Sequence, residues 1–212
     1  MPSFKELQTK RWDREYSQKG SLWHGPAHPD IEIPKKARVL ELGCGNGKTL
    51  SGILKANSKV TAIDSSKEAV GLCRKMAEKL GRNDAEILVA DVCELPFSDS
   101  SFDIVLAFHI LEHLLSEDRE KAVSEIKRVL VPGGKAFIRV FSVGDMRFGK
   151  GKEIEKNTFM RGNQLAYHYF TERELEDLFS DFKKKETRII ARDVHYEKKT
   201  FRRERIQAVF EN

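Results

Sequence analysis

The sequence lacks any long apolar run, and no stretch approaches the roughly 18 apolar residues that a membrane-spanning helix requires. Its N-terminal segment carries charges with no apolar region behind them, so the pattern is not that of a secretory signal. From these two absences we expect a cytoplasmic protein with no membrane partner.

Cysteine is also scarce. The three cysteines, Cys44, Cys73 and Cys93, are an odd number and form no C-x-x-C pair. Such a set argues against a disulfide framework and against a zinc site. We therefore expect no bound metal, and we expect all three side chains to serve as small packing residues.

The composition that remains is that of a globular protein. Of the 212 residues, 40% are hydrophobic and 33% are charged, which is unlike a disordered or a membrane chain. A chain of this length can bury one sizeable core, and the sequence contains no internal repeat or low-complexity segment. We therefore expect a single domain over residues 1–212.

Short, continuous apolar runs alternate with helical patterns over the first two thirds of the chain. The runs at residues 39–42, 60–63, 87–90, 104–108 and 136–141 suit strands that are covered on both faces. Strands that alternate with helices predict an α/β fold with a doubly wound, mostly parallel sheet and helices on both of its faces.

Capping signals mark three helices. Ser65 followed by Glu68 predicts a capping box, and Gly81 suits the position just after the end of that helix. A second helix is predicted to begin near Ser116 and to end at V-P-G-G, and a third is predicted to begin at Thr171.

The final third departs from this alternation. Residues 142–169 contain several glycines and no periodicity, which predicts a long loop. Strands are expected near residues 185–192 and 202–210, and they are joined too tightly for a helical crossover. We therefore expect an antiparallel hairpin at the sheet edge.

The stretch R-V-L-E-L-G-C-G-N-G-K combines an apolar run, an acid and three glycines. A strand that runs into glycines and then a helix places backbone N–H groups at the carboxyl edge of the sheet, where such folds bind ligands. Asp64 ends the next strand, 21 residues after Gly43, at the position from which a carboxylate can hold both hydroxyls of a ribose. These features fit either a nicotinamide dinucleotide or S-adenosylmethionine.

The chemistry of the loop separates these two ligands. The dinucleotide motif requires glycine where this sequence has Lys48, and a pyrophosphate would be repelled by Glu41 just before the loop. S-adenosylmethionine carries a sulfonium and an ammonium against one carboxylate, so an acid near the loop stabilises it. An NAD-dependent oxidoreductase is the remote alternative.

Four further motifs follow the glycine loop: A-I-D (62–64), A-D-V (90–92), F-D-I-V-L-A-F-H-I-L-E-H-L (102–114) and L-V-P-G-G (130–134). In this order and spacing the set resembles the class I S-adenosylmethionine-dependent methyltransferases, over residues 37–141. The resemblance implies a methyltransferase, a transferase of one-carbon groups, with S-adenosylhomocysteine as product. It also implies a Rossmann-like sheet of seven strands whose last strand is antiparallel.

On this resemblance the single domain has four parts. They are an N-terminal arm or lid (1–36), a cofactor-binding core (37–141), a substrate-loop insertion (142–170) and a C-terminal helix with its hairpin (171–212).

The resemblance also assigns cofactor-binding residues by position. Gly43 and Gly45 approach the methionine part, Asp64 holds the ribose, and Asp91 accepts from the adenine amino group. Glu41 is expected to orient the loop or the cofactor ammonium. The full expected set is Glu41, Gly43, Cys44, Gly45, Asp64, Ser65, Asp91, Val92, Phe108 and, from the N-terminal arm, Trp23.

The methyl acceptor is less constrained by the sequence. Transfer from a sulfonium is an in-line displacement, which requires a base only if the acceptor must lose a proton. His109 is the first candidate for such a base, followed by His113 and His168. The motif A-F-H-I stands where methyltransferases of adenine or glutamine amides have N/D-P-P-Y or F, so the chain resembles the branch acting mainly on small molecules, a pattern that some transfer RNA enzymes share.

Two regions are candidates for a lid over the cleft. One is the aromatic N-terminal arm, which can equally be explained as a packed helix, and the other is the segment 142–169. Their candidate residues are Trp12, Tyr16 and Trp23 in the arm, and Arg147, Arg161, Tyr167 and His168 in the segment.

The charge of the chain is concentrated near its end. Residues 183–205, the basic strip, hold ten basic against four acidic residues, a net charge of +6, whereas the whole chain has +5. Such a strip is either a solvated outer face or a surface for nucleic acid or an anionic substrate, and we favour the solvated face. The expected acceptor is therefore a small molecule, with RNA held by the basic strip as the alternative. The acceptor atom and the oligomeric state stay open.

Overall fold

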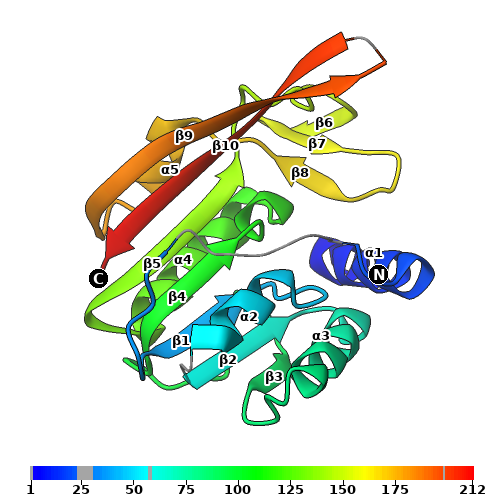
Figure 1. Cartoon of the computed structure of the whole chain (residues 1–212). Coiled ribbons are helices and arrows are strands. Elements are labelled where there is room, and N and C mark those ends of the chain that lie inside the picture. Colours follow the sequence, from blue (N-terminus) through cyan, green and yellow to red (C-terminus); the bar gives the residue numbers. More distant parts are fainter. Residues whose placement is uncertain (1, 23–30, 57–58, 198) are drawn as a thin grey trace.

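The computed structural model describes residues 2–22, 31–56, 59–197 and 199–212. Its main sheet has seven strands in the order β3-β2-β1-β4-β5-β10-β9 (Figure 1). The first five strands in this order are mutually parallel, whereas β10 pairs antiparallel with both β5 and β9. This confirms the predicted fold class and the C-terminal edge hairpin. The strands are β1 (Arg38–Leu42), β2 (Lys59–Asp64), β3 (Glu86–Val89), β4 (Phe102–Phe108), β5 (Leu130–Phe141), β9 (Lys183–Tyr196) and β10 (Lys199–Glu211).

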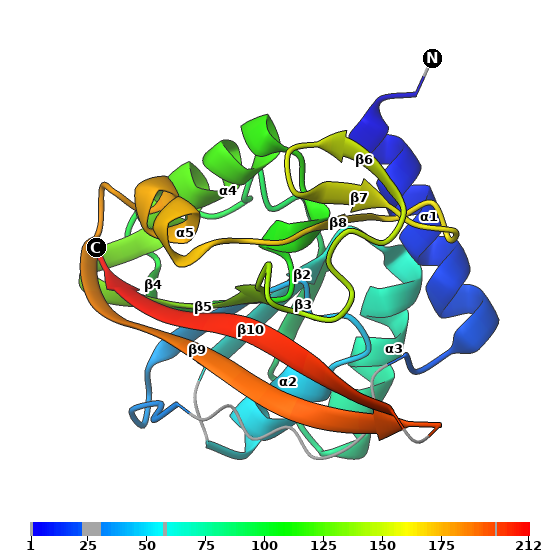
Figure 2. The ribbon, with the colours of Figure 1, turned by 90° about the horizontal axis from the view of Figure 1, so that it is seen from above.

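Helices cover both faces of the sheet (Figure 2). In β1, Leu40 packs in the core under α4 and α5, whereas its neighbour Val39 packs in the core under α2 and α3. Two buried faces explain why the strands are continuously apolar. No helix among the described residues is long and apolar enough to cross a membrane. The helices are α1 (Phe4–Lys19), α2 (Lys48–Ile53), α3 (Lys67–Lys79), α4 (Ser116–Val129) and α5 (Glu172–Leu178), with short 3-10 turns at Leu54–Ala56 and Leu111–His113.

The predicted cap of α3 is wrong by one residue. The hydroxyl of Ser66, not of Ser65, accepts from the backbone N–H of Ala69 at 3.1 Å. The reason is the turn before the helix, in which Asp64 Oδ1 accepts from the Ser66 N–H at 2.9 Å and delays the first helical turn. At the other end Gly81 adopts a φ of 68°, as expected of the residue that follows a helix.

The segment 142–169, predicted as a loop, contains a small antiparallel sheet. Its strands are β6 (Lys152–Glu155), β7 (Thr158–Met160) and β8 (Ala166–His168). They hold three or four residues each, which is too short for an alternating pattern to be recognised.

Helix α1, the structured part of the N-terminal arm, lies between this small sheet and α3 (Figure 2). Gln8 Oε1 accepts from the backbone N–H of Ala166 at 3.0 Å, and Asp13 Oδ1 accepts from the Ser66 hydroxyl at 2.6 Å. The arm is therefore tied to the segment 142–169 on one side and to the end of β2 on the other.

A stack of phenylalanines fixes the hairpin of β9 and β10 to the helical layer. The rings of Phe179 and Phe210 stack with nearly parallel planes, with centroids 4.4 Å apart and an interplanar angle of 6°, and Phe182 packs against both. Phe179 and Phe210 are each 1% exposed. The hairpin is thus held at its buried end, while its other end extends beyond the sheet (Figure 1).

Replacing Phe210 by alanine should remove this anchor. We expect the free energy of unfolding to fall by about 3–5 kcal/mol, as for other buried aromatic truncations. Urea denaturation followed by circular dichroism measures the change. The matched control is Ile189→Ala on β9, where the side chain is 45% exposed, and a loss there as large as that of Phe210→Ala would contradict the anchor.

Candidate functional site

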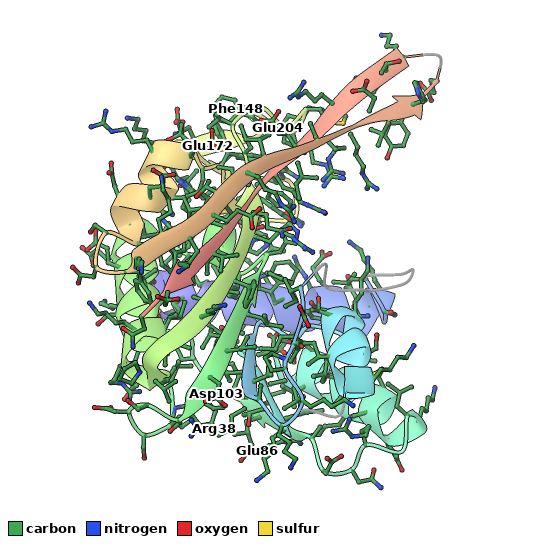
Figure 3. The ribbon with its side chains drawn as sticks, turned by 60° about the vertical axis from the view of Figure 1, so that its left-hand side comes forward. Arg38, Glu86, Asp103, Phe148, Glu172 and Glu204 are labelled. Atoms are coloured by element: carbon green, nitrogen blue, oxygen red, sulfur yellow. The ribbon has the colours of Figure 1, made fainter. Side chains whose placement is uncertain are left out.

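A cavity of about 1040 Å³ opens at the carboxyl ends of β1, β2 and β4. Its walls come from the glycine loop, α1, the segment 142–169 and the hairpin of β9 and β10. The ion pair of Arg38 and Asp103, with a separation of 2.8 Å, lies at the opposite end of the sheet (Figure 3). Parallel sheets bind their ligands at the carboxyl edge, so this cavity is the candidate site.

Almost all predicted site residues meet in this cavity. Trp23 lies outside the described residues, and His168 does not line the cavity. The lining residues predicted from sequence are Glu41, Gly43, Cys44, Gly45, Asp64, Ser65, Asp91, Val92, Phe108, His109 and His113.

The glycine loop requires its glycines for backbone reasons. Gly43 and Gly47 have φ values of 70° and 81°, in the left-handed region that favours glycine. A Cβ on Gly43 would lie 3.1 Å from the Cδ1 atom of Ile110, and one on Gly47 only 2.4 Å from the Cε atom of Met76. The loop therefore leaves little room for a side chain at either position.

Asp64 shapes this loop as well as lining the cavity. Its Oδ2 atom accepts from the Gly45 N–H at 2.9 Å, while Oδ1 holds the turn to Ser66. Burial raises the pKa of Asp64 to about 6, although its backbone hydrogen bonds act in the opposite direction. Ser65, which does not cap α3, is exposed beside it.

Glu41 is a buried acid near the end of β1. Its residue is 3% exposed, and Oε2 makes no hydrogen bond among the described residues. Burial raises the pKa of Glu41 well above its usual range, and the nearby Cys73 and Asp64 raise it further. Nothing within the described part of the chain compensates this carboxyl group.

These features fit a cationic ligand. An orphaned carboxyl oxygen beside a glycine loop can accept from an ammonium group, which would compensate both its burial and its missing hydrogen bond. The two acids Glu41 and Asp64 would repel a pyrophosphate at the same place. The residues present are therefore suited to the S-adenosylmethionine expected from the sequence.

Asp91 has a partner that the sequence did not suggest. Lys5 of α1 forms an ion pair with its carboxylate, and the backbone N–H of Cys93 donates to Oδ1 at 2.9 Å. Burial alone would raise the pKa of Asp91, but Lys5 and Cys93 together hold it below its ordinary value. The N-terminal helix thus covers the end of the cavity where the adenine was expected.

The other predicted cofactor contacts are apolar. Cys44 and Val92 are 4% and 7% exposed, and Phe108 is 8% exposed with the guanidinium of Arg139 4.2 Å from its ring centroid. Cys44 packs against Cys73, and both are free thiols, as the sequence predicts.

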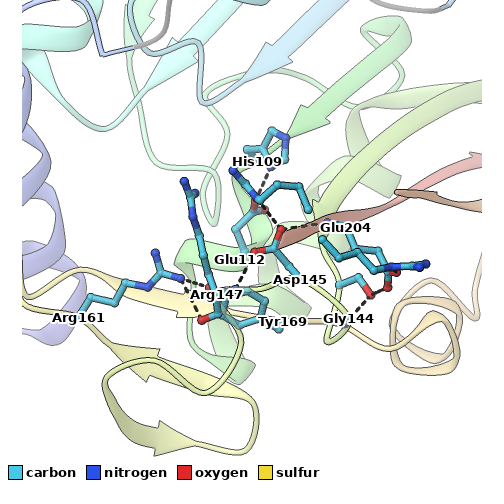
Figure 4. Close-up of polar contacts among 11 residues, drawn as sticks. His109, Glu112, Gly144, Asp145, Arg147, Arg161, Tyr169 and Glu204 are labelled. Atoms are coloured by element: carbon cyan, nitrogen blue, oxygen red, sulfur yellow. Dashed lines mark hydrogen bonds and ion pairs between the residues drawn. The ribbon is translucent and has the colours of Figure 1, made fainter. Parts of the chain in front are cut away.

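His109 and Glu112 form a close pair at the end of β4 (Figure 4). His109 Nδ1 lies 2.6 Å from Glu112 Oε1, and Glu112 is fully buried with Oε2 unpartnered among the described residues. His109 also has a φ of 60°, a strained value for a residue with a Cβ, and its ring packs 5.0 Å from that of Phe141. With Nδ1 engaged, Nε2 is the nitrogen left for a ligand.

His113 presents a neutral ring to the cavity. Its Nδ1 lies 2.9 Å from the carbonyl oxygen of Ala166, which can only accept, so Nδ1 carries the proton and Nε2 is an acceptor. Burial lowers the pKa of His113, which favours this neutral form. The ring makes edge contacts with Trp12 at 4.9 Å and Tyr167 at 5.0 Å between centroids.

His168, the third histidine considered as a base, does not line the cavity. It is 1% exposed, with Nδ1 2.8 Å from Thr158 Oγ1 and Nε2 2.7 Å from Glu174 Oε1. Both ring nitrogens are thus engaged within the fold, so His168 is a structural residue.

The cavity also has a basic end that sequence motifs did not identify. It is formed where the segment 142–169 meets the hairpin, and only spatial proximity brings its residues together (Figure 4). Arg147, Arg161 and Tyr167 are predicted lid residues, and the residues between 192 and 205 belong to the basic strip. Nothing in the sequence indicates Arg139 or Asp145 as lining residues. The added lining residues are Arg139, Asp145, Arg192, Arg203, Glu204 and Arg205.

Comparison with known proteins identifies the core. Residues 40–138 match the model of the family described as "Methyltransferase domain". The structure also resembles a solved S-adenosylmethionine-dependent methyltransferase from Methanosarcina mazei, with a TM-score of 0.73 and 24% identity over 89% of this chain and 99% of that one.

Two curated relatives are named for transfer RNA. The zebrafish (Danio rerio) tRNA N(3)-cytidine methyltransferase METTL2 is 34% identical over 154 residues, which is 68% of this chain and 43% of the relative. A bovine (Bos taurus) protein called "Probable tRNA methyltransferase 9B" is 30% identical over 161 residues, 73% of this chain and 29% of the relative. The chain therefore spans less than half the length of these relatives.

The raised pKa values of Glu41 and Asp64, which lie beside the glycine loop, predict a pH dependence of stability. A carboxyl group whose pKa is higher in the folded than in the unfolded state binds more protons when folded, so stability falls as pH rises. For Asp64, the change from 3.8 to about 6 corresponds to at most about 3 kcal/mol, lost between pH 4 and pH 7. Glu41 adds to the loss in the same direction.

Glu41→Gln removes one of these two groups. We expect the decline in the free energy of unfolding between pH 5 and pH 8, measured by urea denaturation at fixed ionic strength, to become shallower than in the wild type. Equal declines in the two proteins would show that burial does not raise the pKa of the Glu41 carboxyl group.

Proposed function

The chain belongs to the class I S-adenosylmethionine-dependent methyltransferase family, and from this membership we propose that it methylates a base of transfer RNA. The names of the relatives support this acceptor, because METTL2 and the 9B protein are both named for transfer RNA. The proposal replaces the small-molecule acceptor that the sequence favoured. We take residues 1–212 to act as one catalytic domain.

One observation carries the proposal: a single cavity has an acidic end and a basic end. Glu41 and Asp64 lie at the first, where a cationic methyl donor is stabilised. Arg147, Arg192 and Arg203 lie at the second, where an anionic acceptor is stabilised. An RNA nucleotide supplies both a methylatable base and phosphate charge.

The residues of the acidic end are suited to specific parts of the donor. S-adenosylmethionine supplies an electrophilic methyl group on a sulfonium. Glu41 would hold the ammonium group, and Asp64 the ribose hydroxyls, as the resemblance implies for these positions. Asp91 and Val92 would meet the adenine, with Lys5 closing that end from α1.

His109 would orient the acceptor base. Since the METTL2 relatives are named for N3 of cytidine, we take N3 of a cytosine as the acceptor atom. That nitrogen has a lone pair, so the reaction requires alignment with the methyl group rather than prior removal of a proton. The amino group beside N3 would donate to Nε2 of His109, whose Nδ1 is held by Glu112.

The basic strip would hold the RNA backbone. It forms the hairpin of β9 and β10, and Arg192 and Arg203, which are paired across these strands, both line the cavity. The charge of the hairpin therefore reaches the cavity mouth instead of facing only solvent. Phosphates that flank the reacting nucleotide would bind along it.

Methyl transfer to RNA tests the proposed function directly. The protein is incubated with methyl-labelled S-adenosylmethionine and either unmodified transfer RNA or a small-metabolite extract, and the labelled RNA is digested to nucleosides. We expect label in a methylated cytidine. Label only in metabolites would restore the small-molecule acceptor and contradict the proposal.

RNA binding, measured by fluorescence anisotropy at several salt concentrations, tests the hairpin with two charge-matched variants. Arg192→Gln with Lys199→Gln removes one charge that lines the cavity and one toward the hairpin tip, and it should weaken RNA binding while making its salt dependence less steep. Lys183→Gln with Lys185→Gln removes two charges at the far end, where both lysines pair with Glu211. Equal effects of the two pairs would argue against a specific RNA path.

The role of His109 is tested by His109→Asn, because asparagine tolerates a positive φ better than most residues. The variant removes the imidazole without adding backbone strain. We expect kcat/KM for RNA to fall by roughly 10- to 100-fold, since a misaligned acceptor loses about this much, with unchanged affinity for S-adenosylhomocysteine in calorimetry. Activity within two-fold of wild type would remove His109 from the site.

A further inference from the structure

Two arginines at the basic end of the cavity have side-chain N–H groups without a hydrogen-bond acceptor among the described residues. The half-buried Arg147 side chain makes no hydrogen bond or ion pair with the residues that the structure describes, although its backbone N–H donates to Asp145 Oδ1 at 3.0 Å. Arg161 donates from Nη2 to the Arg147 carbonyl and the Tyr169 hydroxyl, but its buried Nε has no partner in the described chain. Both side chains line the cavity.

The nearest acids are engaged by other groups. Asp145 is 3% exposed, and its Oδ2 accepts from Arg203 Nε at 2.8 Å and from the Glu204 N–H at 3.0 Å. The Glu204 carboxylate in turn accepts from the Ser142 hydroxyl and from Arg202 Nε, each at 2.6 Å. Neither acid forms a salt bridge with Arg147 or Arg161.

Partly buried guanidinium groups without an anion are costly. Burial lowers the pKa of Arg147, and the neighbouring Arg203 lowers it further, so the charged form of Arg147 is destabilised. In Figure 4, Arg147 extends from its loop on the side where His109 lies. An anionic group in the cavity would compensate both arginines and satisfy their free N–H groups.

Aromatic rings lie beside these arginines. The Arg161 guanidinium is 4.1 Å from the ring centroid of Tyr167, and the edge contacts of His113 join Tyr167 to Trp12. Trp12 comes from α1 and Tyr167 from β8, so two separate segments enclose the same space. Such rings provide a surface on which a flat base can stack.

We propose that this end of the cavity is a nucleotide subsite, in which Arg147 and Arg161 bind a phosphate of the substrate RNA while Trp12 and Tyr167 stack an unpaired base. The neutral Nε2 of His113 accepts from the second N–H of the amino group whose first N–H is donated to His109. The assignment rests on the proposed RNA acceptor and adds which residues recognise it. It requires the reacting base to leave its helix or to lie in a single-stranded loop, because a paired base cannot enter.

Phosphate and base contacts have different signatures, so two variants separate them. Binding of a fluorescein-labelled, unmodified transfer RNA is measured by anisotropy with saturating S-adenosylhomocysteine, at several salt concentrations. Arg147→Gln should weaken binding about ten-fold or more and make the slope of log K against log salt less negative by about 0.7–0.9. Trp12→Ala should weaken binding about ten-fold with the wild-type slope.

Two controls make the result specific. Arg173→Gln removes a charge from α5, whose Arg173 side chain is 92% exposed, and it should reproduce wild-type binding. Trp12→Phe retains a ring and should lose less affinity than Trp12→Ala, which separates stacking from a general weakening of α1. Melting temperatures of all variants identify any that fail to fold, and for a Trp12→Ala protein that does not fold, Tyr167→Ala takes its place.

The outcomes distinguish this inference from the proposed function. If the wild type methylates RNA but Arg147→Gln keeps the wild-type salt slope, or Trp12→Ala and Tyr167→Ala keep wild-type affinity, the subsite is wrong and the RNA acceptor stands. If the wild type neither binds nor methylates RNA, the proposed function fails and the subsite fails with it.

Discussion

The buried carboxyl group of Glu41 is the constraint from which the site follows. Glu41 lies at the end of β1, 3% exposed, with Oε2 unpartnered among the described residues. A sheet of this kind could bury an apolar residue there at no such cost. A glutamate at this position is explained if a cationic ligand binds beside it. The need for a positive charge favours a sulfonium donor with an ammonium group over an anionic dinucleotide.

The two ends of the cavity are built by different means. The acidic end rests on strand ends in the middle of the sheet, where the register of β1, β2 and β4 fixes Glu41, Asp64 and His109. The basic end is assembled from α1, the segment 142–169 and the hairpin, which meet only in the folded chain. One end fixed by the sheet and another that varies with the connecting segments would let the same fold serve many ligands.

The parts that could be predicted are those with a local cause. Continuous apolar runs predicted the central strands because both faces of the sheet are covered, and the three glycines predicted the loop because its backbone angles require them. The cap of α3 was placed on Ser65 rather than Ser66, because the sequence does not reveal that Asp64 holds the intervening turn. Strands as short as β7 carry no periodic signal at all.

The contacts that could not be predicted join distant segments. Nothing near Lys5 in the sequence indicates its ion pair with Asp91. The hydrogen bond from Arg203 to Asp145 depends on the register of the hairpin. The basic strip was predicted to be a solvated face, because charge alone does not show how the hairpin is placed relative to the cavity. Only the structure shows that Arg192 and Arg203 line the cavity.

The central claim is that one cavity holds the methyl donor at Glu41 and an RNA base at the aromatic end. A crystal structure of the chain with S-adenosylhomocysteine and a cytidine-containing RNA stem-loop tests it most directly. The account predicts the cofactor ammonium at Glu41 and its sulfur facing a base that contacts Trp12 and Tyr167. A cofactor with its amino-acid end at Arg147, or RNA bound on another face with the aromatic end empty, would contradict it.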